Sequence, residues 1–353
     1  MALIPENADG DQSVGVSYVM PVLAEADHIA AAIQALFEQD YDGPVEIVVA
    51  VGPSDDGTEE ILADLARQDS RVRVIPTPAG STPVGLNLAI RASVHPIVIR
   101  VDAHSELPAD YTRVAVETIA RTDATNVGGV MAAEGRSPFE RAVARAYRSR
   151  VGLGGSKHHV GGAEGPAETV YLGVFQREHL LRLGLFDEGI RRGQDWELNR
   201  RIRSQGGVVW FTPALTVTYR PRSSLRRLAT QFFSTGVWRG ELARRFSIAS
   251  NPRYAAPPAL VVLTGLTLLV GVAGIVTSVV TGRPAWPLLA FLVIPGAYVV
   301  AVVVAGIVVI RPAGPRSVLW GFLVLPCIHF SWGYGFLLGW LRLARDIAAV
   351  NGR

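Results

Sequence analysis

Asp102 and His104 stand where a protein of the right fold could do chemistry on a substrate. They follow a short apolar run at residues 97–101, which is bounded by turn-forming residues. Such a run predicts a buried strand, and ligands of open α/β sheets bind just beyond the carboxyl ends of their strands. The two side chains could therefore meet one metal ion or phosphate, although an aspartate that merely caps the next turn explains Asp102 equally well.

A second acidic site lies at Asp195 and Glu197, in the first turn of a helix predicted over residues 193–206. The helix dipole favours carboxylates at this end, and a carboxylate can also act as a general base. Helix capping needs only one such residue, whereas here two flank Trp196. The pair therefore favours a functional site over a simple cap.

A glycine-rich loop at residues 152–165 contains Lys157, His158 and His159. Adjacent histidines rarely both face one ion, because a metal site needs its ligands to converge. The composition favours a polar, mobile loop near a phosphate or an acceptor over a metal site.

Strands and helices alternate along the first part of the chain, which predicts βαβ units and a mainly parallel α/β sheet. We expect a flexible segment at residues 1–13 and a catalytic domain at 14–222. No G-x-G-x-x-G follows the first strand and no Walker lysine is present, which argues against dinucleotide and P-loop sites. The predicted strands are 14–22, 45–51, 72–75, 97–101, 126–132 and 168–175, and the predicted helices are 25–38, 59–68, 80–92, 137–150, 177–183 and 193–206.

The composition is unusually apolar, with 49% hydrophobic residues in 353 and a mean hydropathy of +0.27. The formal charge is +3, and Cys327 is the only cysteine, which excludes intrachain disulfides and cysteine metal clusters. No signal peptide is visible at the amino terminus, so we expect the polar part of the chain to stay in the cytoplasm.

Three charge-free stretches at residues 259–281, 286–310 and 317–341 follow, each longer than the roughly 20 residues that cross a bilayer. They predict three transmembrane helices in a membrane domain at 257–353. Arginines before the first stretch and between the last two favour the cytoplasmic side, but three crossings would leave Arg342 and Arg345 outside. Either one stretch is re-entrant or this tail is tolerated.

Residues 223–246 mix arginines with leucine, phenylalanine and tryptophan. This composition is typical of a helix lying in the headgroup plane, so we expect an amphipathic interfacial region at 223–256.

Several motifs occur in a fixed order over residues 14–345: PVLAEADHI, GPSDDGT, GLNLAI, VDAHS, GQDWELNRRI and QFFSTGVWR. The ordered set resembles the family 2 glycosyltransferases with a GT-A fold, which is Rossmann-like. Within them it is most similar to bacterial succinoglycan-type glucosyltransferases of exopolysaccharide synthesis.

The resemblance implies roles for particular residues. Asp102 and His104 would hold a divalent metal, Mn²⁺ or Mg²⁺, with histidine suiting Mn²⁺ better. Asp195 would be the general base, and Gln194 beside it stands where many members have glutamate. The residues implied to contact the nucleotide sugar are Pro21, Glu25, Asp56, Asp102, Lys157, Gln194, Gln231, Trp238 and Arg239. Spacing of the last three differs from the Q-x-x-R-W element, so processivity is not implied.

The resemblance further implies an inverting transfer from a nucleotide-diphosphate sugar, with UDP favoured, to a hydroxyl of a lipid-linked or glycan acceptor. We expect a multi-pass protein of the inner membrane that contacts lipid, has its catalytic domain in the cytoplasm and does not bind nucleic acid. Three alternatives stay open: a polyprenyl-phosphate glycosyltransferase, a processive polysaccharide synthase and a non-catalytic nucleotide-sugar scaffold.

Overall fold

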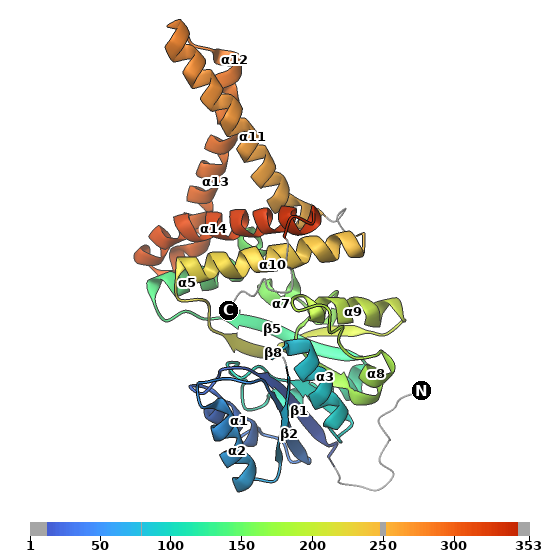
Figure 1. The fold of residues 1–353 in the computed structure, drawn as a ribbon. Coiled ribbons are helices and arrows are strands. Elements are labelled where there is room, and N and C mark those ends of the chain that lie inside the picture. The colour runs from blue at the N-terminus through green and yellow to red at the C-terminus, as the bar shows by residue number, and fades with distance from the viewer. Residues whose placement is uncertain (1–12, 79, 248–251, 345–353) are drawn as a thin grey trace. The chain divides into compact units, whose positions relative to one another are not determined.

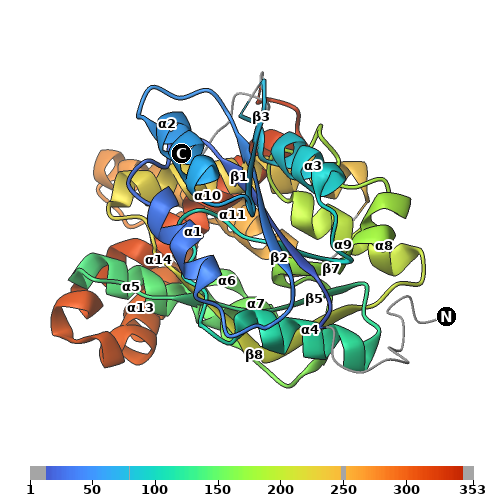
Figure 2. The same ribbon diagram turned by 90° about the horizontal axis from the view of Figure 1, so that it is seen from below.

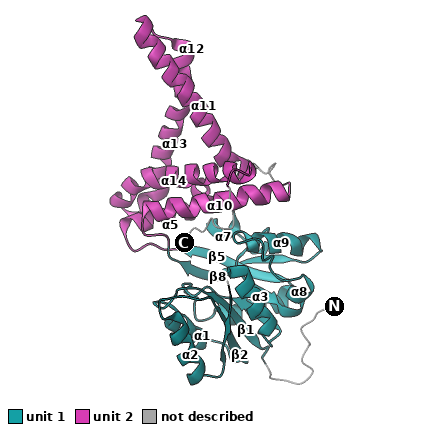
Figure 3. Ribbon diagram, viewed as in Figure 1, with its two compact units in different colours: residues 1–132, 156–220 teal, residues 133–155, 221–353 magenta. Residues whose placement is uncertain are grey.

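A computed structural model of the chain describes residues 13–78, 80–247 and 252–344. These residues form two compact units (Figure 3). The first unit contains the described residues up to 132 together with 156–220, and the second contains 133–155 and the described residues from 221 onward. The predicted flexible segment 1–13 lies almost entirely outside the described residues.

The first unit is built on an eight-stranded sheet whose strands run in the order β3-β2-β1-β4-β7-β5-β8-β6 (Figure 1). Strands β1 to β4 pair in parallel, while β7 is antiparallel to both β4 and β5. The predicted α/β class is therefore correct, and the sheet is a mixed one. The strands are β1 (Val16–Val22), β2 (Val45–Val51), β3 (Val72–Pro76), β4 (Ile97–Arg100), β5 (Asn126–Ala133), β6 (Gly165–Pro166), β7 (Tyr171–Gln176) and β8 (Val209–Tyr219).

Helices cover both faces of this sheet, as Figure 2 shows for α1 and α2 on one side and α3 on the other. One core lies between the strands and α1, α2 and α4, and the other lies under α3, α8 and α9. The helices of this unit are α1 (Ile29–Phe37), α2 (Thr58–Gln68), α3 (Thr82–Ala92), α4 (Tyr111–Thr122), the single turn α7 (Lys157–Val160), α8 (Arg177–Arg182) and α9 (Gln194–Ser204).

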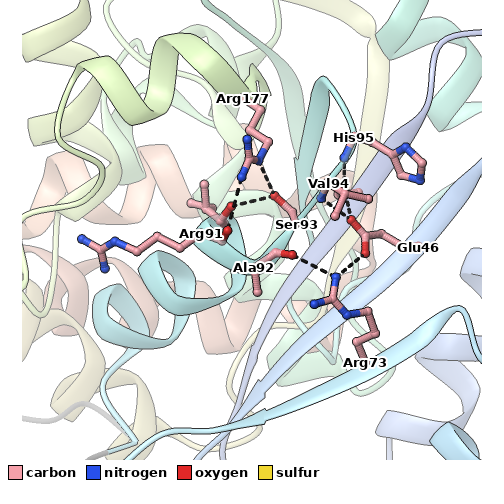
Figure 4. Close-up of polar contacts among 10 residues, drawn as sticks. Glu46, Arg73, Arg91, Ala92, Ser93, Val94, His95 and Arg177 are labelled. Atoms are coloured by element: carbon pink, nitrogen blue, oxygen red, sulfur yellow. Dashed lines mark hydrogen bonds and ion pairs between the residues drawn. The ribbon is translucent and has the colours of Figure 1, made fainter.

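Glu46, a buried residue of β2, fixes the start of strand β4 (Figure 4). Its Oε1 atom accepts bonds from the Ser17 hydroxyl and the Val94 amide, both at 2.6 Å, and its Oε2 atom lies 3.0 Å from Arg73 Nη1. Burial alone would raise the pKa of Glu46, but these bonds outweigh it and lower the pKa. The charged carboxylate therefore stabilises the fold.

We expect Glu46→Gln to lower the free energy of unfolding by about 1–2 kcal/mol at neutral pH, because hydrogen bonds to a charged group are lost. A lowered folded-state pKa gives stability that is present above the ordinary value near 4.3 and is lost as pH falls through the folded value. Thermal unfolding of the detergent-purified chain should therefore separate the two proteins at pH 7 and bring them together in acid. The exposed Glu60→Gln should match the parent at every pH.

The second unit consists of helices, three of which are long and apolar enough to cross a membrane: Tyr254–Thr281, Trp286–Ala313 and Pro315–Trp340. The predicted presence of three helices that are long and apolar enough to cross a membrane is therefore confirmed. The helices of this unit are α5 (Pro138–Tyr147), α6 (Arg150–Leu153), α10 (Leu225–Arg245), α11 (Pro252–Thr281), α12 (Trp286–Leu289), α13 (Val293–Ile310) and α14 (Pro315–Trp340), with 3-10 turns at Ala290–Leu292 and Arg311–Ala313.

Candidate active site

The carboxyl end of β4 and the amino end of α9 meet at one buried arginine. Nε and Nη2 of Arg100 each lie 3.1 Å from Asp102 Oδ1, and Nη1 donates to Asp195 Oδ1. The Arg100 side chain is 7% exposed, against 21% for Asp102 and 42% for Asp195. Two carboxylates that are far apart in the sequence thus bind one buried guanidinium, and the Asp195 carboxylate is the more exposed of the two.

Charge holds this cluster together. Burial of Arg100 acts to lower the pKa of its guanidinium, but the charges of Asp102 and Asp195 outweigh burial and raise that pKa. A buried charge is tolerated when it is paired and hydrogen-bonded, and a guanidinium can bond two carboxylates at once. Arg100 therefore stays positively charged between the two aspartates.

The backbone places both acids at the same edge of the sheet. Arg100 is the last residue of β4, and Asp102 follows where the chain leaves the sheet. Asp195 is the second residue of α9, which starts after Gly193 at a φ of +83°, in the left-handed region that suits glycine. The amino end of a helix favours the carboxylate of Asp195.

Glu197 has a different role from Asp195. It is buried and pairs with Arg201 at 2.8 Å, and Arg201 also donates to the carbonyls of Leu183 and Leu185. This pairing ties α9 to the loop that precedes it. Of the two acids that the sequence singled out in this helix, only Asp195 contacts Arg100.

His104 lies beside Glu25, which comes from the loop after β1. The His104 Nδ1 atom is 3.3 Å from Glu25 Oε1, and the histidine side chain is 48% exposed. Pro21 belongs to β1 itself and pairs with Ala50 of β2. The structure thus brings these residues to the strand ends where the site was predicted.

Asp56 organises the loop after β2. Its carboxylate accepts bonds from the Ser54 hydroxyl, from the amide and hydroxyl of Thr58 and from the Ala26 amide. The Thr58 hydroxyl bond is the main cause that lowers the pKa of Asp56. Asp56 therefore links the loops after β1 and β2, and its contact with a nucleotide stays a prediction.

Tyr171 is a neighbour of the cluster that sequence reasoning missed. Burial is the main cause that raises the pKa of its phenol, and the charge of Asp102 raises it further. Tyr171 is the first residue of β7, the antiparallel neighbour of β4. The sequence around Tyr171 does not indicate a site residue, because only the order of the strands in the sheet places this tyrosine near Asp102.

The side chain of Lys157 bonds within its own loop, and that of Gln194 is buried. Lys157 Nζ lies 3.1 Å from the Ala163 carbonyl and 3.4 Å from the Pro166 carbonyl, so it closes its own loop. Gln194, the first residue of α9, is buried.

Gln231, Trp238 and Arg239 belong to α10 and therefore to the second unit. The Gln231 side chain accepts a bond from Arg222 Nε at 3.2 Å, Trp238 is buried, and Arg239 lies 5.0 Å over the Tyr254 ring. These contacts are internal to that unit.

The residues at the end of β4 fit a metal site that substrate would complete. Within the described part of the chain, no group of three or more His, Cys, Asp or Glu side chains could hold a metal ion. Mg²⁺ sites at nucleotides, however, often use one or two carboxylates together with substrate phosphates. Asp102 offers such a carboxylate and His104 an exposed imidazole, a pair that suits Mn²⁺ better than Mg²⁺.

Comparison with known proteins bears on this geometry. A family model described as glycosyl transferase family 2 matches residues 17–182. The succinoglycan biosynthesis protein ExoA of Rhizobium meliloti (strain 1021) is 34% identical over 225 residues, which are 63% of this chain and 68% of ExoA. The family match includes β4 and Asp102 but ends before Asp195, so the role of Asp195 depends on its contact with Arg100.

Two more distant proteins are similar as well. A dolichyl N-acetyl-α-D-glucosaminyl phosphate 3-β-D-2,3-diacetamido-2,3-dideoxy-β-D-glucuronosyltransferase of Methanococcus voltae is 23% identical, covering 65% of this chain and 74% of that protein. Among solved structures, the mannosyltransferase PcManGT from Pyrobaculum calidifontis, in complex with GDP-Man and Mn²⁺, has a TM-score of 0.54 at 20% identity, over 92% of this chain and 91% of that one. The second likeness shows a shared GT-A fold.

Proposed function

The chain belongs to glycosyl transferase family 2, and from this premise we propose a membrane-anchored, inverting glycosyltransferase. It would move a sugar from a nucleotide-diphosphate sugar to a hydroxyl of a lipid-linked or glycan acceptor in cell-envelope or exopolysaccharide synthesis. The single observation that carries this proposal is the convergence of Asp102 and Asp195 on Arg100. The donor side and the acceptor side of the reaction then share one site.

Asp195 is the proposed general base. Its carboxylate is partly exposed and takes the proton of the acceptor hydroxyl while the hydroxyl oxygen attacks the anomeric carbon. The bond from that carbon to the diphosphate breaks with its electron pair on the leaving oxygen. One displacement without a covalent intermediate inverts the anomeric centre.

Asp102 and His104 are the proposed ligands of a divalent cation, Mn²⁺ or Mg²⁺. Such a cation, when bound, neutralises charge on the leaving diphosphate. Arg100 holds Asp102 in position by donating two hydrogen bonds, each of 3.1 Å, to its Oδ1 atom. The Mn²⁺ in the mannosyltransferase structure supports a metal here.

Donor and acceptor identities are proposals drawn from the relatives. The resemblance favours a UDP-sugar, whereas the mannosyltransferase from Pyrobaculum calidifontis is in complex with GDP-Man, so the donor screen should contain both nucleotides. The Methanococcus relative is named for transfer to a dolichyl-linked sugar phosphate, which supports a lipid-linked acceptor. The apolar helices of the second unit support a membrane location. The inner membrane, with the first unit in the cytoplasm, is the location that we propose, because arginines before the first apolar helix favour the cytoplasmic side.

The experiment is a donor screen on the full-length chain, purified in detergent, with a lipid-linked saccharide extract and either Mn²⁺ or Mg²⁺. We expect one labelled nucleotide sugar to pass a single sugar to the lipid fraction, and Asp102→Ala to abolish this transfer. Long products would instead support a processive synthase. Donor binding without turnover in the intact chain would contradict the proposal and support the scaffold alternative.

A further inference from the structure

Helix α10 is too highly charged to cross a bilayer. Arginines lie near both of its ends, and the uncharged stretch between them is only residues 228–238. That stretch spans about 16 Å of helix, roughly half of a hydrocarbon core of about 30 Å. An amphipathic helix of this composition lies along the membrane surface.

Helix α14 runs beside α10 in the same direction. Near one end, Cys327 Sγ contacts the Leu225 carbonyl, and toward the other end Gly335 packs against Phe233. Gly240 meets Phe336 and Trp340 at the far end. The contacting residues thus rise from 225 to 240 in α10 as they rise from 327 to 340 in α14. The two helices are therefore neighbours along almost all of α10. A crossing by the last half of α14 would carry α10 and its arginines into the hydrocarbon.

Helix α14 packs against the start of α11 and against α13 from Tyr298 to Ile310. Gly333 of α14 packs against the Pro257 carbonyl near the start of α11, and Gly321 packs against Ile310 at the end of α13. The Tyr298 hydroxyl and His329 Nδ1, 3.0 Å apart, add a contact higher on α13. Figure 1 shows α14 lying across the lower ends of these two helices, beside α10.

Helices α11 and α13 rise from this base as a hairpin. At the far end, α11 packs against the segment that precedes α13: Gly271 meets Leu292 of the 3-10 turn, and Gly274 meets Leu288 of α12. Mean hydropathy is 2.5 and 2.7 for the two arms but 1.4 for α14. The arms expose apolar side chains throughout, and Trp286 at the tip is exposed beside Arg283, as an interfacial anchor would be.

We propose that the chain crosses the membrane twice, through the α11–α13 hairpin, and that α14 lies in the interface beside α10. Two crossings return the chain to the side from which it entered. Arg342 then joins the arginines of α10 on the cytoplasmic side, and Arg283 is the one basic residue in the connection across the membrane. This distribution obeys the positive-inside rule, which three crossings violate.

The partner that this surface fits is the lipid headgroup and upper acyl region. Leu319, Leu323 and Tyr334 recur on one face of α14, Leu341 follows the last residue of the helix, and each is more than half exposed. The Tyr334 ring also lies 6.0 Å from that of Phe233 in α10, at the border of this face. Tyrosine is enriched at membrane interfaces, which fits the exposed ring of Tyr334. A shallow apolar layer between headgroups and acyl chains covers such a face, as it covers other amphipathic helices.

The single cysteine makes topology directly measurable. In a Cys327→Ser background, one cysteine is placed at the hairpin tip (Pro284→Cys), one after α14 (Leu343→Cys) and one on α2 (Glu60→Cys), which precedes every candidate span. Cells expressing the full-length chain are treated with a membrane-impermeant maleimide before or after permeabilisation. Labelling after denaturation in detergent serves as the reference for each variant.

We expect Pro284→Cys to label in intact cells, and Leu343→Cys to label only after permeabilisation, like Glu60→Cys. Labelling of Leu343→Cys in intact cells would show a third crossing and overturn the proposal. Protection of Pro284→Cys until permeabilisation would overturn it too, because the hairpin would not cross. The assay measures topology alone, so a failed donor screen would leave its result unaffected.

Discussion

Asp195→Asn is expected to lower kcat for transfer to a hydroxyl acceptor by about 10²–10⁴-fold, the usual contribution of a general base. Asparagine keeps the size of the side chain and can still accept a bond from Arg100, but it cannot take a proton. Donor affinity should change little, because Asp195 faces the acceptor in the proposed site. The measurement is kcat with the natural lipid extract, together with the Kd of the donor by calorimetry.

Glu178→Gln is the matched control for this variant. Glu178 is also a carboxylate paired with an arginine, Arg182 at 3.1 Å, but it is exposed on α8 and outside the proposed site. It should retain the parent kcat. An Asp195→Asn enzyme that is fully active would contradict the general-base role. It would favour a lipid-phosphate acceptor, which needs no deprotonation.

The sequence was sufficient to predict the parallel half of the sheet. Strands β1, β2 and β4 are mostly apolar and rich in valine and isoleucine, as is typical of strands buried on both faces, and turn residues mark their ends. Strand β8 was missed because Pro213 interrupts it. The antiparallel position of β7 between β4 and β5 depends on long-range pairing that no local pattern encodes.

The sequence predicted the two acids of the candidate site, but it did not predict that Arg100 joins them. Asp102 and Asp195 follow strand-end and helix-start signals. Arg100, however, was read as part of the apolar run 97–101. A signal was available, because an arginine inside a strand that is otherwise buried must have an acidic partner. Which acids it pairs with could not be read, because Asp195 lies 95 residues away in sequence.

Side chains such as Asp56 and Lys157 show a second limit. Both are polar groups in loops near strand ends, which is what a nucleotide site requires. The structure shows that backbone amides, carbonyls and neighbouring hydroxyls already engage them. Composition cannot separate a residue that shapes a loop from one that meets the ligand, because both need the same chemical groups.

Arg100→Met is the second variant with a large expected effect. Methionine fills the space of the buried stem but leaves Asp102 and Asp195 without their shared cation. We expect the free energy of unfolding to fall by about 2–3 kcal/mol, near the lower end for a broken buried pair because Asp195 is partly exposed. Transfer should fall by about 10²-fold, since both carboxylates lose the group that orients them.

Two further variants separate charge from geometry at this position. Arg100→Lys keeps the charge but lacks the planar fork that reaches both acids, so its activity should lie between those of the parent and Arg100→Met. The triple variant Arg100→Met/Asp102→Asn/Asp195→Asn removes the uncompensated charges. It should recover most of the lost stability, as replacement of a whole buried ion cluster often does, while remaining inactive. Loss of both aspartates makes the triple variant inactive in either case, so its stability tests the ion cluster, and Arg100→Met alone tests the role of the arginine in transfer.

Thermal and denaturant unfolding of the detergent-purified chain, compared with transfer assays on the same preparations, measures these effects. Arg182→Met removes an exposed arginine from an i,i+4 pair with Glu178 and should change stability by less than about 0.5 kcal/mol. If Arg100→Met behaved like Arg182→Met in both assays, Arg100 would not hold the two aspartates in place. The contact that joins the proposed donor side to the acceptor side would then have no role in the reaction.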